Sequence, residues 1–71
     1  MSEASTYNEP YYGLMDLMKR SGLTQERMSK ELGMDRATFN VKINRTNGRD
    51  FTFAEAMKIS KVLSEPAESF F

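Results

Sequence analysis

The sequence predicts a small all-α domain of five helices, in which the second and third helices form a helix-turn-helix. Apolar residues recur every three or four positions through most of the chain, which is the spacing of a buried helix face. Residues that can cap a helix stand before several of these runs. No run alternates between apolar and polar residues as a half-exposed strand does. The 71 residues suffice for one domain, which we place at residues 9–71, after a flexible arm of residues 1–8.

The predicted helix-turn-helix begins at Thr24, whose side chain can accept a free N–H at the start of a helix over residues 25–32. Gly33 supplies the positive φ that a sharp turn needs. Asp35 can cap a second helix over residues 36–44. The second helix of such a pair usually enters the major groove of DNA.

Three further helices are predicted from local signals. Pro10 fits a first helical turn, where its missing N–H is not needed. Thr52 and Glu55 match a capping box. The three helices are expected to run from about Asn8 or Glu9 to Gly22, from Thr52 to about Leu63, and from about Glu65 to Phe70.

The apolar positions of these helices define the expected core. They lie at i, i+3 and i+4 spacings on one face of each predicted helix. Ser29 is small where the two helices of the pair approach closely. The residues expected to face inward are Tyr11, Leu14, Leu17, Met18, Leu23, Met28, Leu32, Met34, Phe39, Ile43, Phe53, Ala56, Ile59, Leu63 and one of Phe70 and Phe71.

The charge of the chain counts against a DNA-binding domain. Ten Lys and Arg residues balance ten Asp and Glu residues, and the pI is about 6.2. Non-specific affinity for DNA comes largely from cations that neutralise phosphates, and DNA-binding domains often have a pI above about 9. The segment from Arg36 to Arg49 nevertheless holds four basic residues and no acid. A modest basic face on a neutral body is therefore expected.

The residues give no support for catalysis or metal binding. The chain has no His and no Cys, so the usual nucleophile–base pairs and zinc ligand sets are missing. It also has no Gly-rich phosphate loop. We therefore expect no enzymatic activity, no cofactor, no metal and no small-molecule substrate. No apolar run approaches the roughly 20 residues of a membrane span, and the absence of Cys fits a reducing cytosol.

Two motifs carry a resemblance to a known family. Thr24-Gln25-Glu26 and Gly33-Met34-Asp35-Arg36, followed by the fourth predicted helix, resemble the Cro/CI-type (XRE) helix-turn-helix family of phage and bacterial regulators. The likeness covers roughly residues 12–70. The segments Phe39–Asn44 and Phe51–Phe53 are similar to small regulators of temperate phages called modulators of repression. The chain departs from the family at Ser29, where alanine is usual, and at Lys42, where an aliphatic residue is common.

The resemblance implies a lambda-repressor-like fold and a role in a phage lysogeny switch. Modulators of repression bind the repressor of the phage and block its DNA-reading surface, so a phage repressor is the expected partner. The alternative is a Cro-like repressor that acts directly on operator DNA, and a homodimer is compatible with both. By resemblance, the residues that face the target are Gln25, Arg36, Ala37, Asn40, Val41 and Asn44, with Lys42, Arg45 and Arg49 near the path of phosphates.

The same residues fit either target chemically. Arg36 can bind guanine through two hydrogen bonds, and Gln25 or Asn40 can pair with adenine. Ala37 and Val41 can contact thymine methyl groups. A protein partner fits equally well, because Ala37 and Val41 are apolar on an outer face and have a charge at their edge. The neutral charge favours the protein partner.

Overall fold

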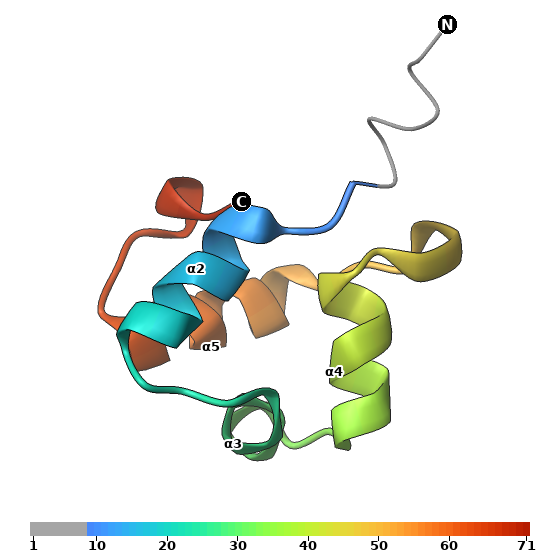
Figure 1. The fold of residues 1–71 in the computed structure, drawn as a ribbon, viewed down its shortest axis with the longest axis horizontal. Helices are drawn as coiled ribbons and strands as arrows, with labels where there is room; N and C mark the ends of the chain where they lie inside the picture. The colour runs from blue at the N-terminus through green and yellow to red at the C-terminus, as the bar shows by residue number, and fades with distance from the viewer. Residues whose placement is uncertain (1–8) are drawn as a thin grey trace, which may run out of the picture.

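Four α-helices and two single 3-10 turns make up the computed structural model, which describes residues 9–71 (Figure 1). No strand occurs in these residues, so the prediction of an all-α chain is confirmed for them. The predicted arm of residues 1–8 lies outside the described residues. None of the described helices has the length and apolarity needed to cross a membrane. In order, the elements are α2 (Tyr12–Arg20), α3 (Gln25–Leu32), α4 (Arg36–Ile43), η1 (Thr46–Gly48), α5 (Phe53–Leu63) and η2 (Ala67–Ser69).

The first described helix begins later than the sequence predicted. It starts at Tyr12, after Tyr11 with a non-helical ψ of 77°. The N–H of Tyr11 donates to the carbonyl of Ile43 at 3.0 Å, so this residue bonds across the molecule. Pro10 also disfavours a helical conformation in the residue before it. The prediction that Pro10 lies in the first helical turn was therefore wrong.

The predicted fifth helix is a single 3-10 turn. Ser64 ends α5 in the left-handed conformation, with a φ of 56°, and Pro66 is extended, with a ψ of 145°. The extended Pro66 prevents a helix from starting at Glu65. After the turn, Phe70 leaves helical geometry with a φ of −138°, and its ring is buried. The prediction of five helices was wrong in this segment, because the left-handed Ser64 and the extended Pro66 interrupt helical geometry.

The core lies where α2, α3, α4 and α5 converge. Most of the expected inward residues are confirmed, and Phe70 rather than Phe71 is the buried terminal ring. Leu17, Leu23, Met34 and Ala56 are only partly buried. The buried apolar residues are Leu14, Met18, Met28, Leu32, Phe39, Ile43, Ile59, Leu63 and Phe70.

The expected core was wrong at Phe53, because 81% of the surface of this residue is exposed. It is the first residue of α5, where the helix starts at the edge of the core. Phe51, two residues earlier, lies against the core with its ring centre 5.4 Å from that of Phe39. A loop residue therefore occupies the place that helical spacing assigned to Phe53.

The helix caps follow the sequence closely. Thr24 Oγ1 accepts from the N–H of Arg27 at 3.1 Å, and Asp35 Oδ1 accepts from the N–H of Thr38 at 2.8 Å. The predicted boundaries of α3 and α5 agree with the structure within a residue. These start signals were readable because each depends on residues close together in the chain.

Replacing Phe39 with alanine should lower the free energy of unfolding by about 3–5 kcal/mol, because a fully buried ring leaves a cavity. The matched control is Phe53→Ala, which removes the same ring from a largely exposed site. It should change stability by less than about 0.5 kcal/mol. Urea unfolding followed by circular dichroism measures both. Equal losses in the two variants would contradict this assignment of the core.

Candidate binding face on α3 and α4

A turn of three residues sets α3 and α4 at a steep angle (Figure 1). Gly33 adopts the left-handed conformation with a φ of 73°, and its N–H donates to the carbonyl of Lys30. The N–H of Met34 donates to the carbonyl of Ser29, which completes the helix end. Ser29 is buried, and its hydroxyl donates to the carbonyl of Glu26 at 2.7 Å. The turn is therefore fixed by backbone hydrogen bonds.

The outer side of α4 carries an open hollow of about 440 Å³. Arg36, Ala37, Asn40 and Val41 line it, and all four were predicted site residues. They lie together because positions i, i+1, i+4 and i+5 share one side of a helix. Arg36, Ala37 and Asn40 are exposed, whereas Val41 is partly buried. The face therefore carries an apolar row, Ala37 and Val41, beside a polar row, Arg36 and Asn40.

Gln25, the first residue of α3, is hydrogen-bonded to Asn40 on this face. The amide nitrogen of Asn40 donates to Oε1 of Gln25 at 3.1 Å. Gln25 keeps its amide donors, and Asn40 keeps its carbonyl acceptor. Asn44 instead donates to the backbone carbonyl of Asn40 at 2.9 Å, so its amide nitrogen is used within its own helix. The two outer amides of Gln25 and Asn40 thus form a preorganised donor–acceptor pair.

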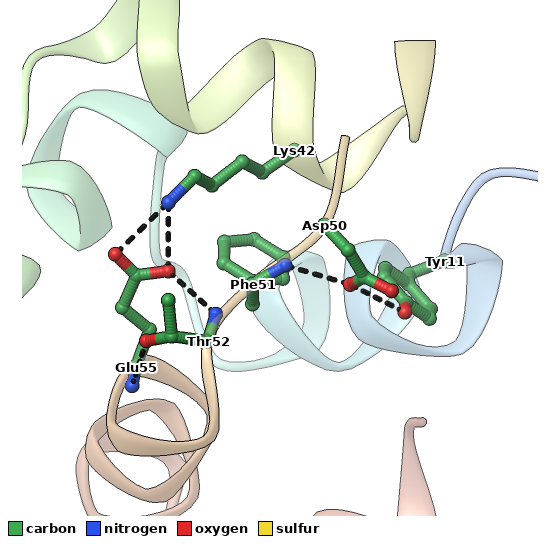
Figure 2. A network of polar contacts seen from close by, with 6 residues as sticks. All are labelled: Tyr11, Lys42, Asp50, Phe51, Thr52 and Glu55. Atoms are coloured by element: carbon green, nitrogen blue, oxygen red, sulfur yellow. Dashed lines mark hydrogen bonds and ion pairs between the residues drawn. The ribbon is translucent and has the colours of Figure 1, made fainter. Parts of the chain in front are cut away.

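Lys42 reaches α5, as Figure 2 shows. Its Nζ lies 2.9 Å from Oε1 and 3.0 Å from Oε2 of Glu55. The two side chains are only 14% and 21% exposed. The structure therefore does not place the charge of Lys42 beside the outer face, where the sequence analysis expected it.

Arg45 is also held within the molecule. Its guanidinium lies 5.0 Å from the centre of the Tyr11 ring and 4.0 Å from a carboxylate oxygen of Asp50. Its Nε is buried without a hydrogen-bond partner among the described residues. Arg49 is exposed. Of the four predicted cations, Arg36 and Arg49 are exposed, whereas the other two are partly buried beside carboxylates.

Asp50 forms a polar contact that the sequence analysis missed. Oδ1 of Asp50 accepts from the hydroxyl of Tyr11 and from the N–H of Phe51, each at 2.6 Å. Burial and the hydrogen bond to Asp50 raise the pKa of Tyr11 to about 12. Figure 2 shows Phe51 between this contact and the Lys42–Glu55 pair. No local signal in the sequence indicated the contact between Tyr11 and Asp50, because these residues lie 39 positions apart.

The pKa of Glu55 reflects two opposing effects. Burial raises it, but the hydrogen bonds from Lys42 and from the N–H of Thr52 outweigh burial and hold it below 4.5. The carboxylate therefore stays charged in the folded chain at neutral pH.

No match to this chain was found among protein-family models, curated proteins or solved structures. Within residues 9–71, no group of three or more Asp and Glu side chains is placed to hold a metal ion.

Glu55→Gln should lower the free energy of unfolding at pH 7 by about 1–3 kcal/mol, because hydrogen bonds to the charged carboxylate are lost. The folded pKa is depressed, so this stabilisation is present above pH 4.5 and disappears as pH falls through the lower folded pKa. Urea unfolding from pH 7 to pH 3 should show the parent and the variant converging.

The matched control for this titration is Glu31→Gln. Glu31 forms an exposed pair with Arg27, and such pairs contribute less than about 1 kcal/mol. If the difference in the free energy of unfolding between the parent and Glu55→Gln stays constant down to pH 3, the role given to Glu55 is contradicted.

Proposed function

We propose that this chain is a phage lysogeny regulator with a lambda-repressor-like fold, in which α3 and α4 form the helix-turn-helix. In this proposal its outer face binds the repressor protein of the phage and covers the surface with which that repressor reads DNA. The protein then acts in the cytoplasm of the bacterial host. A hetero-complex with the repressor is its working form.

The inward pairing of Lys42 carries this proposal. Affinity for DNA depends on cations that neutralise phosphates. Lys42 is bound by Glu55, and Arg45 lies beside Tyr11 and Asp50. Of the four cations between Arg36 and Arg49, only these two end residues are therefore exposed, in a chain with zero net charge. Solvent-accessible apolar side chains beside polar ones, as Ala37 and Val41 lie beside Arg36 and Asn40, also suit protein association.

The Gln25–Asn40 pair favours operator DNA as a second candidate. An amide donor beside an amide acceptor matches the N7 and N6 groups of adenine in the major groove. Arg36, exposed on the same face, can bind guanine. These groups give sequence preference, but they supply little of the phosphate contact on which affinity depends.

Co-purification with the repressor encoded beside this chain, with and without operator DNA, tests the first candidate. A stable complex is expected, and Val41→Asp should weaken it at least about 100-fold by burying an unpaired charge. The control is Ser69→Asp, which adds the same charge in η2 on an exposed residue. Full binding by Val41→Asp would remove this face from the interface.

A gel-shift titration with operator duplex tests the second candidate. If the repressor is the target, this chain alone should give no shift at micromolar concentration. A shift whose affinity falls steeply with rising salt would instead assign direct DNA binding. Arg36→Met should then reduce the preference for the operator over random DNA.

A further inference from the structure

We propose that Lys42 is a positioning residue that fixes the rotation of α4 against the start of α5. Its pairing with Glu55 then sets how Ala37 and Val41 are presented, although neither charged group contacts the partner. The link to binding rests on the proposed function. The effect on α4 itself is a property of the free chain and can be measured without a partner.

The position of Lys42 in α4 explains how its pairing with Glu55 can affect Val41. Val41 lines the outer hollow, and Ile43 is fully buried in the core. Lys42 lies between these neighbours and extends to α5 (Figure 2). Because side chains radiate from a helix at fixed angles, holding Lys42 holds the direction of Val41 as well.

Glu55 is a firm anchor because it is itself held at the start of α5. The N–H of Thr52 donates to its Oε1 at 2.9 Å, and its own N–H donates to Oγ1 of Thr52 at 3.1 Å. Lys42 Nζ binds that same Oε1 and also Oε2. Lys42 is therefore joined, through one carboxylate, to the backbone where α5 begins.

The other contacts of α4 fix its ends and its inner side. Asp35 caps its start, and the carbonyl of Ile43 accepts the N–H of Tyr11 at its end. Phe39 buries its inner side in the core. Apolar packing is non-directional, whereas the two hydrogen bonds from Lys42 to Glu55 connect α4 to one defined point on α5. The Lys42–Glu55 pair is thus the directional contact from the body of α4 to α5.

The first test compares NMR spectra of the free parent with those of Lys42→Met and Glu55→Gln. Each variant breaks the pair from one side, so both should move the amide and methyl signals of Ala37 and Val41. The double variant should move them no further than one single variant, because both changes remove the same contact. Lys42→Arg should restore the parent positions, since Arg can bind both carboxylate oxygens.

Two controls separate positioning from general loss of stability. Lys58→Met removes an exposed Lys from α5 and should leave the α4 signals in place. Ile59→Val removes one methyl group from the buried side of α5 but keeps the ion pair and the contacts that hold Glu55. It should lower the melting temperature while leaving Ala37 and Val41 unmoved. Unmoved α4 signals in both Lys42→Met and Glu55→Gln would overturn the inference.

The second test measures repressor affinity for the same variants at a temperature where each is folded. Lys42→Met should weaken binding about tenfold, and Lys42→Arg should restore it to within about twofold. If the parent binds no repressor, the proposed function fails while the NMR result still decides the positioning role. If Lys42→Met binds as tightly as the parent, with α4 signals unmoved, the positioning role fails and the proposed function stands.

Discussion

The carboxylate of Glu55 is the constraint on which the arrangement of this fold depends. One oxygen accepts the N–H of Thr52 and closes the capping box of α5, and both oxygens bind Lys42 of α4. The same carboxylate thus caps α5 and connects α5 to α4. In a chain of 71 residues the core is small, and this ion pair adds a polar link between α4 and α5 to the apolar packing.

Features that depend on neighbouring residues could be predicted from the sequence. The caps at Thr24 and Asp35, the left-handed Gly33 and the spans of α3 and α5 all follow from residues a few positions apart. The predictions that were wrong depend on distant contacts. α2 begins only at Tyr12, because the N–H of Tyr11 donates to the carbonyl of Ile43. Phe53 is exposed, because Phe51 lies beside Phe39.

The residues of the candidate site also differ in how far the sequence could predict their placement. The resemblance named Arg36, Ala37, Asn40 and Val41, and helical spacing explains why these four residues share one side of α4. The directions of Lys42 and Arg45 could not be predicted, because a long cationic side chain adopts the direction of its nearest partner. Those partners, Glu55 and Asp50, lie on other segments, and their positions follow only from the folded chain.

The hydrogen bond from Tyr11 to Ile43 joins the start of α2 to the end of α4. The bond breaks when either of these ends moves away, so fraying at the start of α2 also releases the carbonyl at the end of α4. The two helix ends therefore stabilise each other, although they lie far apart in the chain.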